Sequence, residues 1–399
     1  MLAVSLAALG AVWLAAGFPT ADLRVYRAEG AAVVDGTDLY GFTVTKWHLP
    51  ATYPPFAALG FVPLTWLPLP AAQAAVTALN VGLLALLVRL SLRLAGVAPG
   101  RRAPAVLAAT AVGLWLEPVF RTMTFGQVNL LLACLVVWDL ARPEGARGKG
   151  LLIGIAAGIK LTPAIFAVHL AVTGRLRAAC TAAAGFVGTV LLGAAVLPGA
   201  TVDFFTRRLF ETGRVGKAWI VDNQSLQGLF ARLAHEVDPG VFWPAAVAGT
   251  AAGGLWLARR AHLHHDRPLW ALLCTAFTAL LVCPISWTHH WVWCVPLLVQ
   301  LAVHARRRRA RWPWAVLAGT FVVFTARTMW LVPHEGAGDL RMPWWLQPAA
   351  SPYPLLALAL LAAVAWRVAV PPVRAGETAV RLPRQTSSPA SSSPESTIR

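Results

Sequence analysis

Residues 286–293, SWTHHWVW, place two adjacent histidines among three tryptophans, between two long apolar runs. Side chains of these types suit a metal site, an aromatic cluster or a contact to phosphate. On a helix, His289 and His290 would point about 100° apart, so they cannot readily chelate one metal ion together. We therefore favour a phosphate or substrate contact by one histidine, with the other packed among tryptophans. Aromatic packing of both is the alternative.

A carboxylate stands where a general base would be useful. Asp22 lies in ADLRVYRAEG (21–30), a few residues past the first apolar run. Partial desolvation there would raise the pKa of the carboxyl towards neutral pH, which suits removal of a proton from a hydroxyl. The alternative is a solvent-exposed aspartate at a helix end. Asp35 and Asp38 compete for the same role, but the Gly-Thr turn between them favours exposed positions.

Three cationic side chains are candidates to hold a phosphate. Lys160 lies in GIKLTP (158–163), where Pro163 and a charge interrupt an apolar segment. Its ammonium would meet a phosphate, or else it would extend to the membrane interface. Arg214 and Lys217 flank a glycine in the polar segment 214–228, and flexible loops with cationic side chains often bind anions.

Amide and aromatic side chains near these charges suit a sugar. Amides both donate and accept hydrogen bonds, as sugar hydroxyls do, and aromatic rings pack on sugar faces. For Gln127 and Asn129, which follow Gly126, capping of a helix is the alternative. The candidates for sugar or acceptor binding are Tyr26, Tyr53, Gln127, Asn129, Asn223, Gln224 and Trp287.

The segments that must position these residues belong to a membrane protein. The chain has 399 residues, of which 57% are hydrophobic and only 13% charged, about half the charged fraction of soluble proteins. Apolar runs of membrane-spanning length recur, which predicts an all-α polytopic membrane protein of about 10–12 helices. The predicted spans are 2–18, 71–95, 104–121, 127–141, 177–197, 240–258, 268–284, 289–305, 312–332 and 354–370.

The distribution of charge predicts the topology. The net charge of +17 comes from short basic clusters between apolar runs, such as RRRRAR (306–311), which is typical of cytoplasmic loops rather than of nucleic-acid binding. With the N-terminus inside, 56–69 lies at the interface or only half crosses. Residues 150–173 dip in and return as two short helices.

In this topology the polar segments share the extracytoplasmic face. Lipid cannot satisfy their hydrogen-bonding groups, so they are expected to line one protein cavity. We expect a membrane domain over 1–370 with active-site loops at 19–55, 199–239 and 333–353, and a disordered cytoplasmic tail at 371–399. No DxD motif is present, and we expect neither a metal nor a cofactor.

The ordered strings DLRVY, YPPFAAL, GQVNLLL, GIKLTP, NQSLQG and HHWVW resemble glycosyltransferase family 87 over about residues 20–300. The resemblance implies a C-type glycosyltransferase fold in the cell membrane with an extracytoplasmic site. It implies inverting transfer of a mannosyl or other hexosyl residue from a polyprenyl-phosphate donor to a glycolipid or lipoglycan of the cell envelope. Asp22 matches the expected base in the first outer loop.

Two other classes of protein fit part of the pattern. A transporter or flippase of lipid-linked sugars would also use a basic, aromatic cavity, but it would place polar groups on both faces of the membrane. A structural subunit of an envelope complex would not need polar segments to converge. The sequence does not distinguish mannose from another sugar, and it does not identify the acceptor.

Overall fold

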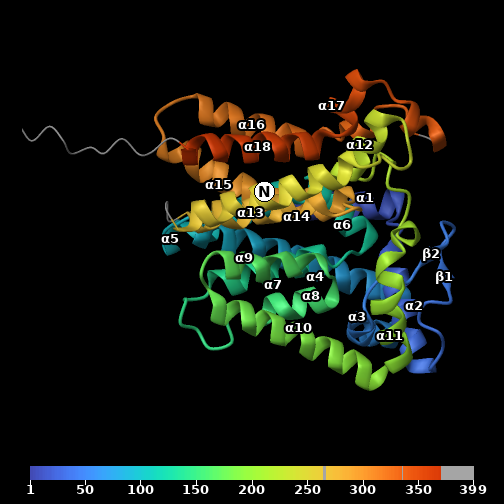
Figure 1. Ribbon diagram of the computed structural model, residues 1–399. Coiled ribbons are helices and arrows are strands. Elements are labelled where there is room, and N and C mark those ends of the chain that lie inside the picture. The colour runs from blue at the N-terminus through green and yellow to red at the C-terminus, as the bar shows by residue number, and fades with distance from the viewer. Residues whose placement is uncertain (264–266, 335, 370–399) are drawn as a thin grey trace, which may run out of the picture.

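The computed structural model describes residues 1–263, 267–334 and 336–369, and this part of the chain is a helical bundle (Figure 1). Within these ranges the only sheet is a two-stranded antiparallel hairpin of β1 (Thr43–Val44) and β2 (Leu49–Pro50). The predicted tail at 371–399 lies outside the described residues.

The α-helices are α1 (Leu2–Ala16), α2 (Ala21–Asp35), α3 (Pro55–Phe61), α4 (Leu69–Leu94), α5 (Pro99–Gly113), α6 (Glu117–Phe125), α7 (Asn129–Ala141), α8 (Leu151–Ile159), α9 (Ile165–Val172), α10 (Leu176–Val196), α11 (Pro198–Thr206), α12 (Leu226–Ala234), α13 (Phe242–Leu263), α14 (Pro268–Val282), α15 (Cys294–Arg307), α16 (Trp312–Thr325), α17 (Gln347–Ala350) and α18 (Pro352–Ala369). The 3₁₀ helices are η1 (Val62–Trp66), η2 (Thr162–Ala164), η3 (Arg208–Phe210), η4 (Thr212–Arg214), η5 (Thr288–Trp293), η6 (Thr328–Trp330), η7 (Gly336–Arg341) and η8 (Trp344–Leu346).

The helices make this an all-α polytopic membrane protein. By length and composition, α4 and α10 can each cross a bilayer, and three bent helix pairs pass the same test together. Other apolar helices are shorter than the roughly 20 residues of a full span; α7 has 13 residues and α14 has 15. The predicted total of 10–12 spans therefore stays a prediction.

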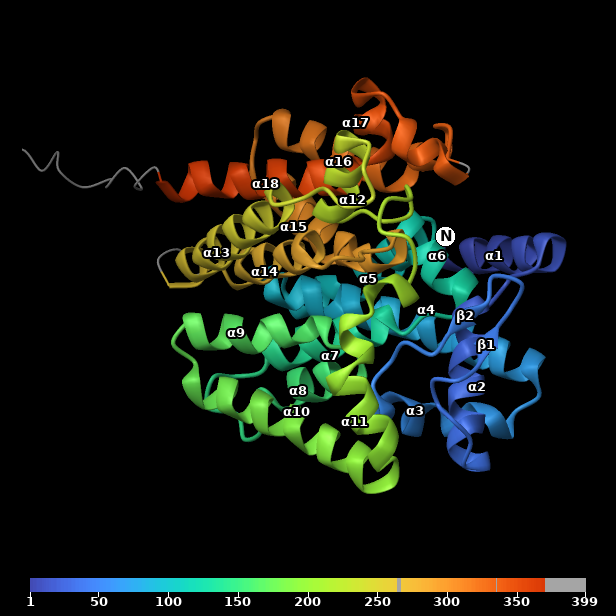
Figure 2. The ribbon, with the colours of Figure 1, turned by 45° about the vertical axis from the view of Figure 1, so that its right-hand side comes forward.

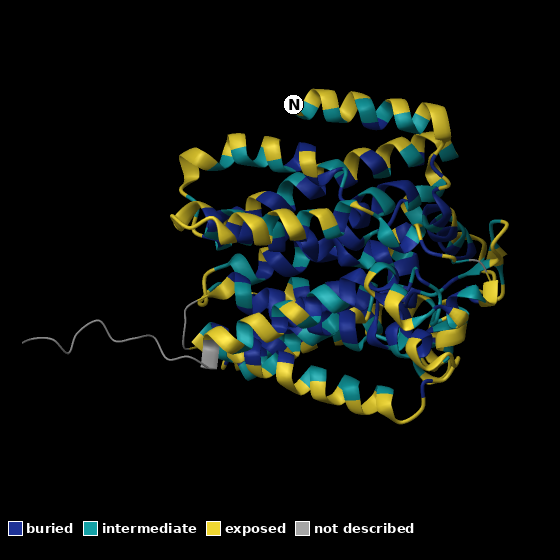
Figure 3. Cartoon of the chain, turned by 90° about the horizontal axis from the view of Figure 1, so that it is seen from above, coloured by how far each residue is buried: buried dark blue, intermediate teal, exposed yellow. Residues whose placement is uncertain are grey.

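The outer surface of the bundle is apolar where lipid would lie. Large hydrophobic side chains such as Leu14 on α1 and Leu191 on α10 are exposed. Seen from above, buried residues occupy the centre and α1 lies at the edge, mostly exposed (Figure 3). A helix that is apolar on its exposed face is stable in a bilayer and unfavourable in water.

Two predicted segments differ in detail from the structure. The connection over 19–55 contains the helix α2 and the β1–β2 hairpin, because Val25, Glu29 and Ala32 recur at helical spacing and are buried. The helix α2 turns 78° away from α1, and the predicted span 104–121 bends by 74° between α5 and α6. Because of these bends, α2 and α6, which carry polar residues, do not continue in the direction of α1 and α5.

Residues 150–173 form the predicted hairpin of two short helices, α8 and α9. Glu144 lies close to both ends of the hairpin, since Lys149 Nζ is 3.1 Å and Arg175 Nη1 is 3.5 Å from its carboxylate. Lys160 caps the C-terminus of α8 in an extended conformation, with φ −150° and ψ 129°. The hairpin therefore presents Lys160 at its tip.

Three glycines let α8 lie directly against α10, and Figures 1 and 2 show α8 and α9 beside α10. Gly150, Gly154 and Gly158 recur every four residues, so they share one face of the helix. A Cβ atom on Gly154 would lie 2.3 Å from the backbone oxygen of Ala182. Small residues at this spacing allow close backbone approach between membrane helices, and here they set the position of Lys160.

Candidate active site

A cavity of about 920 Å³ lies at the end of the bundle that carries α2 and the β1–β2 hairpin. We call it the large cavity. Its lining comes from residues within 21–26, 47–54, 121–127, 160–165, 204–222 and 279–290. Of the predicted active-site loops, 19–55 and 199–239 contribute to this lining.

Asp22 lines the large cavity from the first turn of α2. Unpaired backbone N–H groups at a helix N-terminus favour a negative charge there. Thr20, the residue before α2, has a left-handed conformation with φ 42°. Its hydroxyl accepts a hydrogen bond of 2.6 Å from Gln73 Nε2. The start of α2 is thus held in place from α4.

A hydrogen-bonded group of Tyr26, Tyr53 and Gln127 orients an amide beside Asp22. Both tyrosine hydroxyls donate to Gln127 Oε1, at 2.8 Å and 3.3 Å. The amide nitrogen of Gln127 is then left to bond to the Asp22 carboxylate. All three of these predicted sugar-binding residues line the large cavity.

Gly126 brings this amide close to α2. It ends α6 with φ 72°, a conformation that favours glycine. A Cβ atom at this position would lie 2.7 Å from Leu23 Cβ, next to Asp22 in the chain. The glycine therefore permits the contact that places Gln127 opposite the carboxylate.

Lys160 and His290 form a pair in the large cavity, with 2.9 Å between Lys160 Nζ and His290 Nε2. An ammonium has no lone pair to accept with, so the imidazole accepts and is neutral in this arrangement. Lys160 Nζ also lies 5.5 Å from the centroid of the Tyr53 ring. In this arrangement the positive charge of the pair lies on Lys160, and His290 is its neutral acceptor.

His289 also lines the large cavity and is held through its backbone. Its carbonyl accepts hydrogen bonds from Asn129 Nδ2 at 3.0 Å and Thr122 Oγ1 at 3.3 Å. Its ring packs edge-on against Phe125 and His290. The buried Nε2 has no hydrogen-bond partner among the described residues, so it is available to a ligand.

Arg121 is a functional candidate that the sequence analysis missed. It lines the large cavity, with Nη2 3.5 Å from Asp222 Oδ1 and Nε 3.9 Å from Glu117 Oε1. Glu117 is fully buried and accepts a hydrogen bond of 2.7 Å from Tyr353. The signal in the sequence was the pair Glu117 and Arg121, four residues apart in an apolar stretch. Charged side chains within a membrane are energetically unfavourable, so they usually mark a functional site.

Aromatic side chains cover part of the large cavity. Trp287 and Trp47 both line it. Gly216 has φ 143°, and a Cβ atom there would lie 2.7 Å from the Trp287 ring. The indole of Trp287 therefore packs directly on the backbone of the 214–228 segment.

Two predicted phosphate-binding residues lie outside the large cavity. Arg214 donates to the backbone oxygen of Tyr40 at 3.2 Å and lies 3.7 Å from Glu211. Lys217 is exposed, with Nζ 5.6 Å from the Trp219 ring. Their neighbours Val215 and Gly216 do line the cavity, at the point where the chain leaves η4.

Three predicted amides support the site without lining the large cavity. Asn223 accepts from Ser286 N at 2.8 Å, and its own amide donates to Pro284 O at 2.9 Å. Gln224 Nε2 donates to Ala350 O at 2.8 Å. With Asn129, which holds the His289 carbonyl, these buried amides fix the backbone around the histidines.

The other predicted elements lie around the site. Asp35 and Asp38 are exposed, and Asp38 caps its own turn by accepting from Tyr40 N at 3.0 Å. The described part of 333–353 contributes no residue to the large cavity, although Asp339 accepts from Val221 N at 3.2 Å. Within the described ranges, no three His, Cys, Asp or Glu side chains are grouped so as to hold a metal ion.

The fold and the large cavity define a helical membrane protein with a carboxylate and several cations around one polar, aromatic site. The profile of Glycosyltransferase family 87 matches residues 51–284. The chain belongs to this family and is a membrane glycosyltransferase, as its motifs predicted. No solved structure matches it.

Three relatives are mycobacterial enzymes. The chain is 34% identical over 368 residues to a polyprenol-phosphate-mannose-dependent alpha-(1-2)-phosphatidylinositol mannoside mannosyltransferase of Mycolicibacterium smegmatis, covering 86% of this chain and 83% of the relative. A protein of the same description from Mycobacterium tuberculosis is 33% identical, with coverage of 85% and 83%. A Mycobacterium tuberculosis relative described as the corresponding pentamannoside mannosyltransferase is 36% identical, with coverage of 86% and 80%.

Proposed function

We propose that this chain transfers a mannosyl residue from a polyprenyl-phosphate-mannose donor to a phosphatidylinositol mannoside or a related envelope glycolipid, through an α-1,2 linkage. The observation that carries the proposal is the large cavity itself, in which Asp22 lies within electrostatic range of Lys160 and Arg121. A carboxylate and cations around one cavity suit proton removal from a hydroxyl and departure of a phosphate.

Asp22 is the proposed general base. It lies on α2, which we place outside the membrane-spanning segments. Burial raises the pKa of Asp22 to about 6, although Gln127, Lys160 and Arg121 oppose that rise. A base with this pKa is ionised at neutral pH and is stronger than an ordinary aspartate.

The reaction then needs one displacement. Asp22 takes the proton of the acceptor hydroxyl, and the oxygen attacks the anomeric carbon from the face opposite the phosphate. The bond from that carbon to the phosphate oxygen breaks, and the polyprenyl phosphate leaves with the electron pair. A β-linked donor thereby gives an α-linked product, without a covalent intermediate on the enzyme.

The leaving phosphate is the proposed ligand of Lys160 and Arg121, with His289 Nε2 as a further contact. Lys160 is positioned by His290, and Arg121 is positioned by Glu117 and Asp222. Both cations keep side-chain surface towards the cavity. Hydrogen bonds from charged donors to phosphate oxygens are about twice as strong as neutral ones.

The volume and lining of the large cavity suit two substrates. Its volume lies near the upper end of the roughly 300–1,000 Å³ of ordinary ligand pockets. Leu161, Ile165 and Val282 provide an apolar wall for the start of a polyprenyl chain. Trp47 and Trp287 provide flat aromatic surfaces of the kind that pack against sugar rings.

We further propose that the large cavity faces the extracytoplasmic side of the cell membrane and that the bundle is a C-type glycosyltransferase fold. Two observations support this orientation. The basic cluster 306–311 lies at the opposite end of the bundle, and the end with the large cavity carries the polar segments. Excess Lys and Arg favour the cytoplasmic side.

The test is transfer by the purified, full-length protein. The protein is incubated with polyprenyl-phosphate-mannose radiolabelled in the sugar and with phosphatidylinositol mannosides. Label should move to the glycolipid, and linkage analysis of the product should show an α-1,2 bond. Movement of intact donor across the bilayer of proteoliposomes, without transfer, would instead identify a flippase.

A further inference from the structure

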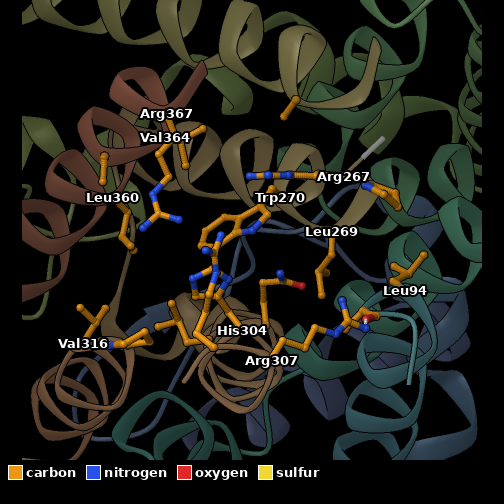
Figure 4. A pocket seen from close by; sticks show the side chains of 18 of the residues that line it. Leu94, Arg267, Leu269, Trp270, His304, Arg307, Val316, Leu360, Val364 and Arg367 are labelled. Carbon is orange, nitrogen blue, oxygen red and sulfur yellow. Dashed lines mark hydrogen bonds between the residues drawn. The ribbon is translucent and has the colours of Figure 1, made fainter. Parts of the chain in front are cut away.

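Figure 4 shows a second cavity, of about 400 Å³. It lies at the opposite end of the bundle from the large cavity. We call it the arginine cavity. Helix α14 runs between the two cavities, since Leu269 lines the arginine cavity and Val282 lines the large cavity. At 1.5 Å per residue, roughly 20 Å of helix separates them. The arginine cavity is therefore distinct from the proposed active site.

Among the described residues, the lining of the arginine cavity gathers positive charge and includes no carboxylate. Arg267, Arg308 and Arg367 line it, and all three lie within electrostatic range of His304 at its centre. Within residues 1–263, 267–334 and 336–369, none of the three forms an ion pair. Like charges held this close are unfavourable unless an anion compensates them.

The remaining polar groups are placed to receive a ligand. His304 Nε2 is buried and has no hydrogen-bond partner among the described residues. Arg367 lies 5.1 Å from the Trp312 ring centroid, which holds its guanidinium towards the cavity. By contrast Arg307 donates to Ala95 O at 2.8 Å, so it is used to hold the end of α4.

The deeper wall is apolar. Leu301, Val316, Leu360 and Val364 line the arginine cavity below the arginines. Exposed tryptophans lie at the same end of the bundle, with Trp312, Trp314 and Trp366 about half exposed or more. Tryptophan is enriched at the interface between a bilayer and water. The cavity thus combines guanidinium groups at the interface with an apolar surface beneath them.

We propose that the arginine cavity binds the phosphate headgroup of an anionic phospholipid, with an acyl chain along its apolar wall. Guanidinium groups bind phosphate oxygens by two parallel hydrogen bonds. Basic pockets between membrane helices are typical sites for anionic lipid headgroups. The apolar wall favours a lipid over free phosphate, which would leave that wall uncovered.

The test compares two variants that lose the same charge. R267Q/R308Q/R367Q removes the arginines of the cavity, and R306Q/R309Q/R311Q removes three exposed arginines of the same basic segment that do not line it. The full-length protein, delipidated in a neutral detergent, is titrated with phosphatidylglycerol. Bound lipid is counted by native mass spectrometry. Phosphatidylcholine and inorganic phosphate are separate arms of the experiment.

In the cavity variant, the dissociation constant of the most tightly bound phosphatidylglycerol should rise at least about tenfold. In the matched variant it should stay within about threefold of the parent value. Phosphatidylcholine should bind the parent more weakly than phosphatidylglycerol. R267K/R308K/R367K should recover part of the affinity, because the charge returns without the planar donors.

Ala363→Trp is a second test, because it retains every charge and fills the cavity from α18. It should also weaken phosphatidylglycerol binding about tenfold, by exclusion of the lipid. Equal losses in the two triple variants would show only diffuse attraction and overturn the proposal. Displacement of the lipid by millimolar inorganic phosphate would overturn the assignment to a lipid.

Discussion

Two carboxyl groups, of the half-buried Asp22 and the buried Glu29, lie seven residues apart on α2, and they separate a proposed catalytic role from a structural one. Asp22 lines the large cavity, whereas Glu29 faces the backbone of Thr52 and Tyr53. Burial raises the pKa of Glu29 to about 8, so at pH 7 it is mostly a neutral acid. An amide is a close mimic of a neutral acid but cannot act as a base.

Asp22→Asn should therefore lower mannosyl transfer by about 10²–10⁴-fold, the usual contribution of a general base. Glu29→Gln is the matched control, and it should retain transfer within about threefold. The measurement is the initial rate with radiolabelled donor, alongside the thermal stability of both variants in detergent. A nearly normal rate for Asp22→Asn would remove Asp22 from the mechanism.

The pH dependence follows from the state of Asp22. The base must be ionised, and burial raises its pKa to about 6, so the rate should fall as the pH drops through about 6. Since the charge of Lys160 opposes this rise, Lys160→Met should move the acidic limb to higher pH. Rates at saturating substrate, measured from pH 5 to pH 8, test both shifts. A rate that stays constant down to pH 5 would mean that Asp22 is not the titrating base.

The two predicted lysines differ in position, and this difference predicts different kinetics. Lys160 lines the large cavity and Lys217 does not. Lys160→Met should reduce kcat/KM for the donor by about tenfold to a hundredfold, because a charge-assisted contact contributes about 1.5–3 kcal/mol. Lys217→Met should change it little. Similar losses in both variants would indicate a general electrostatic effect instead of a phosphate contact.

At the scale of elements, the contact between α8 and α10 positions the tip of the hairpin. Gly154→Ala places a Cβ atom against the backbone of Ala182, so the helices must separate and shift Lys160. We expect a fall in donor kcat/KM together with a lower melting temperature. Gly188→Ala on α10 is the control, because a Cβ atom there meets nothing within 4 Å. Unchanged kinetics in Gly154→Ala would show that the hairpin tolerates the displacement.

A clamp between two distant segments positions the histidines. Gln224 N donates to Ser286 O at 2.8 Å, and Thr288 N donates to Asp222 O at 3.0 Å. Asp222 also lies 3.5 Å from Arg121. One short antiparallel bridge therefore connects the cation, the acid and the histidine segment of the site.

At the scale of the whole molecule, the orientation in the membrane can be tested by labelling. In a variant without native cysteines, Lys217→Cys lies at the end with the large cavity and Arg308→Cys lies at the arginine cavity; both side chains are exposed. An impermeant thiol reagent added to intact cells should modify position 217 and leave 308 unmodified. Lysed cells provide the control for reactivity. The reverse pattern would place the large cavity on the cytoplasmic side.

The separation of the two cavities gives the molecule two ends with different chemistry. The large cavity combines a carboxylate, cations and aromatic rings, whereas the arginine cavity has positive charge over an apolar wall. Both ends share α14, so a lipid bound at one end contacts a helix that also lines the other. The proposed lipid site therefore contacts part of the scaffold of the proposed active site.

The sequence by itself determined the class of protein, the family and the segments that form the site. Apolar length, charge clusters and ordered motifs are local properties of the chain, and they are readable without the fold. The broken segment at Lys160 was also predictable, because Pro163 and a charge cannot continue an apolar helix. Asp22 was a candidate from the sequence, because it lies a few residues past the first apolar run.

Only the tertiary structure decided which side chains face the large cavity. Arg121 enters it because α6 bends away from α5, while Arg214, at the end of η4, and Lys217 lie outside it. Asn129, Asn223 and Gln224 are used to hold backbone that lies far away in the sequence. The direction of a side chain depends on bends and long-range hydrogen bonds, and these form only when the helices pack together.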